Sequence, residues 1–203
     1  MAQHRAGEHR GAVRTAGRVR DLPRLETDRL ILRKMRLEDA EAMFAYASDP
    51  EVTRYVIWAT HRTIEDSRAF LELTVSSYAS GEGLDWGIVY KGDEKFIGTC
   101  GFVSHSPEHA RAEIGYVLSR RYWGRGLAPE AVRALIRFGF ERMGLNRIEA
   151  RCIAGNTVSA RVMEKARMTY EGTLREREKI QGKLRDMKMY SILRREYLAA
   201  RDL

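Results

Sequence analysis

Hydrophobic positions along the chain form strand-like runs in some segments and recur at helical spacing in others. This alternation predicts a mixed α/β fold. Short apolar runs of strand length are centred on residues 30–32 and follow at about 84–91, 95–103, 111–118, 147–153, 168–179 and 184–193. Apolar residues at helical spacing predict helices over about 37–47, 63–80, 127–143 and 157–167. Strands dominate the middle of this order, so we expect one mixed sheet with helices on both faces.

Local signals mark the ends of several of these segments. Residues 63–66, Thr-Ile-Glu-Asp, have the spacing of a capping box, in which the first and fourth residues satisfy each other's backbone amides. Gly81 and Gly83 are expected to end that helix, and residues 92–93 to turn one strand into the next. Pro129 fits only in the first turn of its helix, where its missing N–H is not needed.

Charge is distributed unevenly along the chain. The 203 residues, 44% hydrophobic and 32% charged, fit one globular domain and carry a net charge of +8. Residues 1–24 contribute +4 of this charge, because six arginines there oppose Glu8 and Asp21. They show no usable period, so we expect a basic, disordered arm at 1–24 and a folded domain at 25–203. The rest of the chain gives little support for nucleic-acid binding, which is expected only through the arm.

The sequence does not support a membrane protein, a secreted protein or a metal-binding protein. No run approaches the roughly 18 apolar residues that span a bilayer, and no apolar signal segment follows the N-terminus, so we expect a cytoplasmic protein without membrane contact. Cys100 and Cys152 lie in apolar runs and are expected to be buried free thiols. His105 and His109 have helical metal-ligand spacing, but Pro107 between them excludes the helix, so no metal is expected.

A loop rich in glycine and arginine connects the predicted strand at 111–118 to the helix that starts near residue 127. Residues 120–128 read Arg-Arg-Tyr-Trp-Gly-Arg-Gly-Leu-Ala. The first turn of a helix has unpaired N–H groups and the positive end of the helix dipole, and the arginines add charge. We therefore expect an anion, in particular a phosphate chain, to bind at this loop.

Two common nucleotide-binding motifs do not fit this loop. A P-loop would end in Gly-Lys-Ser/Thr, whereas this loop ends Gly126-Leu127-Ala128. A dinucleotide fingerprint needs Gly or Ala where Pro129 stands, and it should follow its strand directly, whereas residues 119–123 intervene.

The glycine-rich loop, together with the start of the next predicted helix, resembles the GNAT superfamily of acetyl-CoA-dependent N-acetyltransferases. The pyrophosphate signature of that family, Gln/Arg-x-x-Gly-x-Gly/Ala, is matched by Arg121, Gly124 and Gly126. An Asn that opens the next helix is matched by Asn156, with Ser159 one turn further on. The surrounding sequence is similar to the ribosomal-protein N-terminal acetyltransferase (Rim-type) branch in residues 25–33, 49–52, 113–116, 156–160 and 189–193, and the resemblance covers about 25–198.

The resemblance implies a GNAT fold, a single mixed and mainly antiparallel sheet in which the strands before and after the glycine-rich helix splay apart. It implies acetyl-CoA as co-substrate and no metal. The pyrophosphate would be held by the backbone amides of Gly124, Arg125, Gly126, Leu127 and Ala128, with charge from Arg121 and Arg125. Val117 and Leu118 would offer backbone groups to the pantetheine arm, as if to an added strand, and Asn156 would be a second cofactor element.

Two residues are candidates for the chemistry. Glu113 lies in an otherwise apolar strand, where burial would raise its pKa towards that of a working general base, and the resembling relatives place a glutamate there. The alternative is a salt bridge with Arg111 or another arginine. Many superfamily members have a tyrosine as general acid where Met163 stands.

Ser159 is the replacement for that acid in the Rim-type branch, and its hydroxyl can stabilise the leaving thiolate by a hydrogen bond. It could equally be a helix-start cap. Tyr116 and Tyr190 are weaker candidates and are more readily explained as packing residues.

The expected reaction is direct attack of a primary amine on the thioester, without a covalent enzyme intermediate. A terminal α-amine, with a pKa of about 8, is partly neutral at physiological pH, whereas a lysine amine at about 10.4 is almost wholly charged. The N-terminus of a ribosomal or other cytosolic protein is therefore the favoured acceptor. A polyamine, amino acid or aminoglycoside is the alternative, and a non-catalytic acyl-CoA binder or RNA-associated protein is an alternative of another class. A homodimer is compatible with the sequence.

One departure from the family pattern concerns the end of the Asn helix. Relatives often read Glu-Lys-Leu-Gly-Phe there, whereas this chain reads Glu-Lys-Ala-Arg-Met at 164–168. Arg167 stands where the glycine would end the helix, so it must either leave the helix differently or adopt a left-handed backbone.

Overall fold

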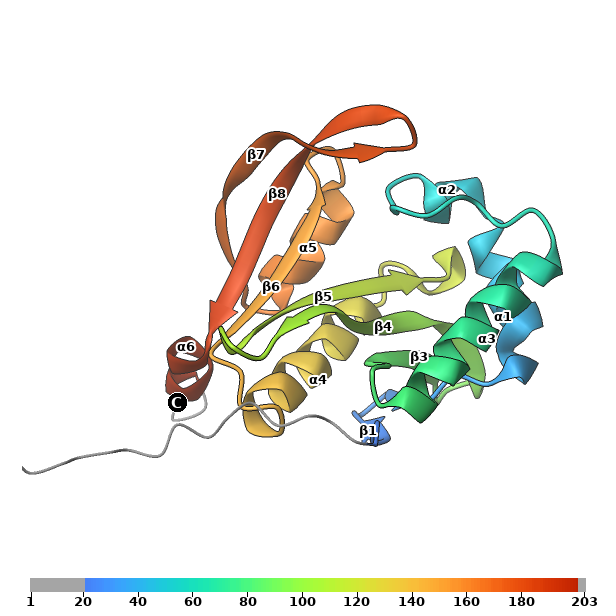
Figure 1. Ribbon diagram of the computed structural model, residues 1–203, viewed down its shortest axis with the longest axis horizontal. Helices are drawn as coiled ribbons and strands as arrows, with labels where there is room; N and C mark the ends of the chain where they lie inside the picture. The colour runs from blue at the N-terminus through green and yellow to red at the C-terminus, as the bar shows by residue number, and fades with distance from the viewer. Residues whose placement is uncertain (1–20, 201–203) are drawn as a thin grey trace, which may run out of the picture.

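The computed structural model describes residues 21–200, and one eight-stranded sheet runs through this part of the chain (Figure 1). The strand order is β1-β2-β3-β4-β5-β6-β8-β7. Every neighbouring pair is antiparallel except β5 and β6, which confirms the single mixed, mainly antiparallel sheet. The strands are β1 (Leu25–Glu26), β2 (Leu30–Arg33), β3 (Asp85–Tyr90), β4 (Lys95–Ser106), β5 (Arg111–Leu118), β6 (Arg147–Ile153), β7 (Thr169–Ile180) and β8 (Lys183–Leu193).

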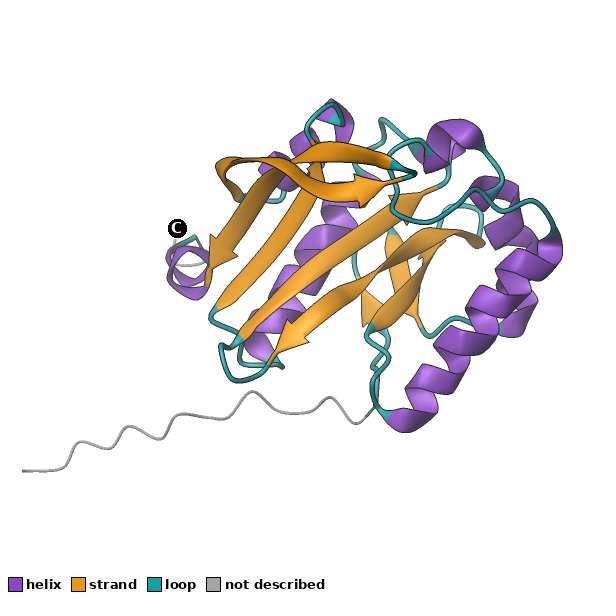
Figure 2. Ribbon diagram, turned by 45° about the horizontal axis from the view of Figure 1, so that its top comes forward, coloured by secondary structure: helices purple, strands orange, loops and turns teal. Residues whose placement is uncertain are grey.

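Helices cover the sheet on both faces (Figure 2). The main helices are α1 (Ala40–Ala47), α3 (Ile64–Ser80), α4 (Leu127–Glu141) and α5 (Thr157–Lys165). Shorter ones are α2 (Pro50–Thr53), α6 (Arg194–Ala199) and two 3₁₀ turns, η1 (Leu37–Asp39) and η2 (Arg120–Tyr122). The predicted helices on both faces are therefore confirmed.

Each face of the sheet has its own hydrophobic core. The larger core lies against α4, where the rings of Trp86 and Phe138 meet edge to face with centroids 5.3 Å apart. The second core lies under α1 and α3 and includes Met43, Leu71 and Phe96. A third, small cluster joins the loop after α2 to the β7–β8 hairpin through Tyr55, Ile153, Ile180 and Met187. These cores fix the orientation of every strand that carries a site residue.

The parallel strands β5 and β6 stay together over only a short distance. They pair at three positions, from Arg111 opposite Arg147 to Glu113 opposite Glu149. Beyond these the strands diverge (Figure 1), while β4 continues beside β5 and β8 continues beside β6. The splayed central strands expected from the resemblance are therefore present.

The structure differs from the sequence pattern in the end of one strand and in short elements that the pattern did not predict. A bulge in β4 between Phe102 and Ser104 restores pairing with β5, so the strand continues to Ser106 through the expected loop. Pro50, expected only to end a helix, also opens α2, with Asp49 as its N-cap. The elements β1 and α6 have two and six residues, too few to show a period.

The predicted arm begins to pack earlier than its composition suggests. Leu22 is buried, and the carbonyl of Pro23 accepts a hydrogen bond from the Trp86 indole at 2.7 Å. The domain therefore extends to residue 21, and residues 1–20 of the predicted arm lie outside the described residues.

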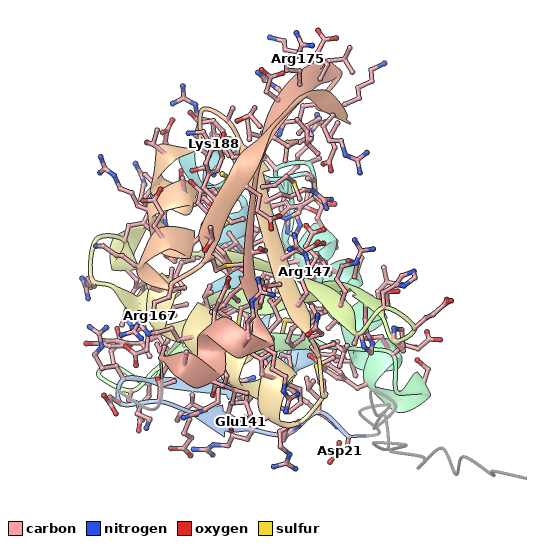
Figure 3. All side chains as sticks on the ribbon, turned by 90° about the vertical axis from the view of Figure 1, so that its left-hand side faces the viewer. Asp21, Glu141, Arg147, Arg167, Arg175 and Lys188 are labelled. Atoms are coloured by element: carbon pink, nitrogen blue, oxygen red, sulfur yellow. The ribbon has the colours of Figure 1, made fainter. Side chains whose placement is uncertain are left out.

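Arg167, labelled in Figure 3, follows the end of α5 and has a left-handed backbone, the second of the two expected ways to leave the helix. Its φ is 66°, its N–H donates to the Glu164 carbonyl at 2.9 Å, and the N–H of Met168 donates to the Met163 carbonyl at 3.0 Å. These two bonds form a Schellman motif, and the buried side chains of Met163 and Met168 accompany it. An arginine thus occupies a backbone conformation that favours glycine.

Replacing Arg167 by glycine is expected to stabilise the protein by up to about 1 kcal/mol, because glycine adopts the left-handed conformation without steric cost. Urea unfolding of Arg167→Gly against the unaltered protein measures the gain. Arg161→Gly, on the exposed side of the same helix, is the matched control and should lose about 1 kcal/mol. Equal destabilisation of both variants would show that the left-handed backbone carries no strain.

Candidate functional site

The glycine-rich loop between β5 and α4 is shaped by two glycines in left-handed conformations. Gly124 has φ 73° and Gly126 has φ 75°, and Gly126 is the N-cap of α4. A Cβ added at Gly124 would meet nothing within 4 Å, so the backbone conformation, rather than lack of space, requires this glycine. Pro129 lies in the first turn of α4, as predicted. The loop therefore leaves open space in front of amides at the positive end of a fifteen-residue helix.

The predicted charged residues surround this loop. Arg121 and Arg125 are both exposed, and the Arg125 guanidinium lies 5.2 Å from the centre of the Tyr122 ring. Arg120 instead forms an ion pair with Asp49 at 2.8 Å. Two of the three arginines in the motif are thus exposed at the loop, and the third is held in an ion pair.

A buried carboxylate behind the loop holds it in place, and the sequence analysis did not identify it. Glu130 accepts hydrogen bonds from the Thr27 hydroxyl at 2.6 Å, the Arg29 amide at 2.9 Å and the Arg29 Nε at 2.7 Å. Burial raises the pKa of Glu130, but these hydrogen bonds outweigh it and hold the pKa below its ordinary value. The carboxylate is therefore charged at neutral pH.

The same arginine reaches the loop itself. Arg29 Nη1 donates to the carbonyl oxygen of Arg125 at 2.9 Å. In a trans peptide the carbonyl and the following N–H point in opposite directions, so this bond turns the Gly126 N–H away from Arg29. Residues 27, 29 and 130 form what we call the loop clamp. In the sequence, Thr27 and Arg29 form a Thr-x-Arg pattern, but this local pattern does not predict a contact with Glu130, about 100 residues further along the chain.

The opening between β5 and β6 exposes backbone groups of alternate residues. The Ser119 N–H donates to the Ile97 carbonyl in β4 at 2.8 Å, so the alternation of an antiparallel pair also directs the backbone of Val117 towards β4. The backbone groups of Tyr116 and Leu118 point the other way, towards β6. Of the two residues predicted to offer backbone groups to the cofactor, Leu118 therefore faces the opening and Val117 faces β4, while Tyr116 also faces the opening. The Leu118 carbonyl also accepts a hydrogen bond from the Trp123 indole at 2.7 Å.

Glu113 lies at the point where the two strands part. Its side chain is buried and forms an ion pair with Arg151 of β6, whose Nε also binds Glu178 of β7 at 2.7 Å. Burial raises the pKa of Glu113, Arg151 opposes this, and the carboxylates of Glu178 and Glu149 add to it, so the pKa lies above its ordinary value. Glu113 therefore forms a salt bridge, with Arg151 rather than Arg111 as its partner. Its pKa is nevertheless raised, so the two expectations for this residue hold together.

Ser159 lies across the opening from Glu113, on the α4 and α5 side of the sheet. Its Oγ is 2.8 Å from the hydroxyl of Tyr116, and the Tyr116 hydroxyl also donates to the Ser159 carbonyl at 3.1 Å. Burial raises the pKa of Tyr116, so its phenol stays protonated at neutral pH. Asn156 caps α5, accepting from the Ser159 amide at 3.1 Å. Two hydroxyls and an amide thus gather beside the diverging strands.

Cys152 adjoins these groups, because its thiol donates to the Asn156 carbonyl at 3.7 Å and is hydrogen-bonded with Ser159. Cys100 and Cys152 are buried free thiols, as predicted, and burial raises the pKa of each. Met163 is fully buried, and Tyr190 donates its hydroxyl to Glu164 at 3.1 Å. The described residues contain no group of three or more His, Cys, Asp and Glu side chains placed to hold a metal ion. Between residues 21 and 200, none of the helices has the length and hydrophobicity to cross a membrane.

Comparisons with known proteins agree with this geometry. A family model described as an acetyltransferase (GNAT) domain matches residues 29–169. The chain is 43% identical over 173 residues to the uncharacterized N-acetyltransferase p20 of Bacillus licheniformis, covering 85% of this chain and 97% of that protein. It is also similar to the crystal structure of a GNAT-family acetyltransferase from Bacillus anthracis, with a TM-score of 0.78, 32% identity and coverage of 86% of this chain and 100% of that one.

A relative whose name refers to ribosomes is more distant. YdaF of Bacillus subtilis (strain 168), named provisionally as a ribosomal N-acetyltransferase, is 33% identical over 123 residues, which cover 59% of this chain and 64% of YdaF. This match does not place the chain in a ribosomal branch.

Loosening the loop clamp is expected to weaken binding of acetyl-CoA more than catalysis. In Glu130→Gln the neutral amide loses the charge-assisted bonds to Arg29, so the KM for acetyl-CoA should rise about tenfold, equivalent to about 1.4 kcal/mol, while kcat changes less than threefold. Steady-state kinetics and CoA titration measure both. Asp28→Asn, exposed beside Arg29, removes the same charge without entering the clamp and serves as control. An unchanged KM in Glu130→Gln would show that the loop keeps its shape alone.

Proposed function

Because this chain belongs to the GNAT family of acetyl-CoA-dependent N-acetyltransferases, we propose that the acceptor of its acetyl group is the α-amine of a protein N-terminus, in particular that of a ribosomal protein. The Rim-type sequence segments and the name of the relative YdaF support the ribosomal choice. The geometry around Glu113 supports the choice of an α-amine, and this observation carries the proposal.

The burial and the moderately raised pKa of Glu113 suit an acceptor amine that is already partly neutral. Its buried carboxylate has a raised pKa, but Arg151 holds it in an ion pair and limits the rise. Such a group can take a proton from an α-amine with a pKa of about 8, directly or through one water, and it suits a lysine amine of about 10.4 poorly. The carboxylates of Glu113 and Glu178 share one arginine, Arg151, so the three side chains together carry one net negative charge. A single negative charge matches a single ammonium group rather than a polyamine.

The residues present fit a bound acetyl-CoA, which supplies the acetyl thioester. The amides at Gly124, Gly126 and the start of α4 would hold its pyrophosphate, and the open space in front of Gly124 leaves room for it. The backbone groups of Tyr116 and Leu118, which face the opening between β5 and β6, would pair with its amide-rich arm as a neighbouring strand would. Asn156 fixes the start of α5 beside that opening.

Ser159 and Tyr116 would act on the leaving sulfur. The Tyr116 hydroxyl has one proton, which it can donate either to the Ser159 carbonyl or to Ser159 Oγ, and in the second arrangement the Ser159 hydroxyl is free to donate outward. A thiol has a pKa of about 8.5, so a hydrogen bond from a hydroxyl suffices to stabilise it as a leaving group. The Ser159 hydroxyl therefore has the role of donor, and Tyr116 that of its partner.

Direct transfer from thioester to amine fits the chain better than a covalent intermediate. The nucleophilic form of cysteine is the thiolate, and burial raises the pKa of both Cys100 and Cys152. Neither cysteine of this chain is thus prepared to accept the acetyl group.

The proposal is tested with three acceptors in one assay. We expect a lysine-free peptide with a free N-terminus to be acetylated with a kcat/KM at least about 100-fold above that of the same peptide N-terminally blocked and given one lysine, because only the first offers a neutral amine. Spermidine represents the small-molecule alternative. Release of CoA thiol and the peptide mass follow the reaction, and purified ribosomal proteins then identify the natural N-terminus by intact mass. Preference for spermidine or for the blocked peptide would contradict the proposal.

Removing the carboxylate of Glu113 is expected to change the pH dependence of the reaction. In the unaltered protein kcat/KM should fall as the pH decreases through the raised pKa of Glu113, since the base form is lost there. Glu113→Gln should slow transfer about 100-fold at pH 7 while the affinity for CoA stays within twofold. Glu171→Gln, which removes an ion-paired carboxylate elsewhere in the sheet, is the control. Equal turnover of Glu113→Gln and the unaltered protein at every pH would exclude Glu113 as the base.

A further inference from the structure

A groove with a volume of about 1060 Å³ lies along the outer side of α4. Elements that are far apart in sequence line it, namely the turn between β1 and β2, α4, the end of α5, and α6. Figure 3 views this side of the molecule, with Arg167 labelled near α6. Buried apolar side chains lie at the base of the groove: Ala134, Ile136, Ala166 and Ile192. A cleft of this size can hold a small-molecule ligand.

The groove is lined by four exposed cationic side chains, those of Arg133, Arg137, Lys165 and Arg167. Within residues 21–200, none of these four forms an ion pair. The acidic residues of the lining are fewer and partly engaged. Glu130 pairs with Arg29 in the loop clamp, and Glu196 accepts a hydrogen bond from the amide that precedes α6. Asp28 is exposed, so the groove as a whole is positively charged.

Two features of this cluster lower the stability of the protein by itself. Arg133 and Arg137 are four residues apart on α4, and like charges at that spacing destabilise a helix. Arg167 has a left-handed backbone, which glycine would adopt without steric cost. Strained backbone of this kind is frequent at ligand-binding sites. An anion between the four side chains would offset the repulsion and would give Arg167 a function that glycine cannot supply.

Hydrogen bonds to the backbone already orient two of the guanidinium groups. Arg133 Nη1 donates to the Lys165 carbonyl at 3.1 Å, and Arg137 Nη2 donates to the Glu26 carbonyl at 3.4 Å. A guanidinium has five N–H donors, so each arginine keeps four for a ligand. The planar arrangement of these donors matches two oxygens of one phosphate group.

The groove is separate from the predicted pyrophosphate site. Arg29 lines the groove and also donates to the Arg125 carbonyl at 2.9 Å. Because that bond turns the Gly126 N–H away from Arg29, the loop amide that would meet the pyrophosphate points away from the groove. The groove therefore lies behind the glycine-rich loop, and an anion in it would bind in addition to acetyl-CoA.

We propose that this groove is a second anion site, which binds a small molecule carrying several phosphate groups. Four cations from α4, the end of α5 and the residue after it can contact more than one phosphate, so a chain of phosphates suits the groove better than a single one. The apolar base would contact an uncharged part of the ligand, such as a nucleoside. This inference does not depend on which amine accepts the acetyl group.

Isothermal titration calorimetry with inorganic tripolyphosphate tests the site, using protein first saturated with CoA so that the glycine-rich loop is occupied. We expect one tripolyphosphate to bind per chain, and orthophosphate to bind at least tenfold more weakly. In the double variant Arg133→Gln, Arg137→Gln, the Kd for tripolyphosphate should rise at least tenfold. The control variant Arg175→Gln, Arg177→Gln removes two exposed charges from β7 and should keep the Kd within twofold.

Arg167→Gly separates ligand binding from folding. Because glycine relieves the backbone strain, this variant should resist urea at least as well as the unaltered protein. Its Kd for tripolyphosphate should nevertheless rise at least threefold, since it lacks one of the four cations. A variant that is as stable and binds more weakly cannot owe the loss to misfolding. An unchanged Kd would exclude Arg167 from the site and contradict the proposal.

Three further results would overturn the inference. Absence of binding to the CoA-saturated protein would show that phosphates bind only at the glycine-rich loop. Equal losses of affinity in the double variant and its control would show a general effect of charge without a defined site. A ten-nucleotide single-stranded RNA that binds at least tenfold more tightly than tripolyphosphate, with the same dependence on Arg133 and Arg137, would assign the groove to nucleic acid instead.

Discussion

The parting of two parallel strands is the constraint on which the site depends. β5 and β6 pair at three positions and then separate, each keeping one antiparallel neighbour. A strand that loses one neighbour must leave backbone donors and acceptors on that side, which is costly unless a ligand or water satisfies them. The glycine loop lies at the end of β5, so the anion site and the unpaired strand edge form one continuous surface. Acetyl-CoA, with a charged end and an amide-rich arm, has both features.

The two halves of the chemistry lie on opposite faces of the sheet at this opening. Glu113 faces the side of α1 and α3, whereas Ser159 and Tyr116 lie on the side of α4 and α5. In the proposed reaction the amine would approach the side of Glu113, and the leaving sulfur would meet the neutral hydroxyls of Ser159 and Tyr116 on the other side. The sheet would then keep proton removal apart from thiol stabilisation, and the two would meet only where the strands have separated.

Local features of the site could be predicted from the sequence, and long-range ones could not. The start of α4 after the glycine-rich loop, with Pro129 in its first turn, and the start of α5 at Asn156 depend on a few neighbouring residues, so their motifs sufficed. Arg151 as the partner of Glu113 depends on the register of a parallel pair, which no local pattern encodes. The direction of the Val117 backbone depends on strand pairing between β4 and β5. Periodicity gave the existence of these strands but not which group of each one meets the ligand.

The loop clamp has a consequence for when the binding site comes into being. Arg29 and Glu130 are 101 residues apart in sequence, so the loop acquires its final shape only after the N-terminal segment and α4 have met. During synthesis, the chain must therefore extend well past its midpoint before it can hold acetyl-CoA. The same connection acts in reverse, because a ligand that binds only the completed loop shifts the folding equilibrium towards the native state by mass action. Cellular acetyl-CoA would thus protect the chain from unfolding as well as supply its substrate.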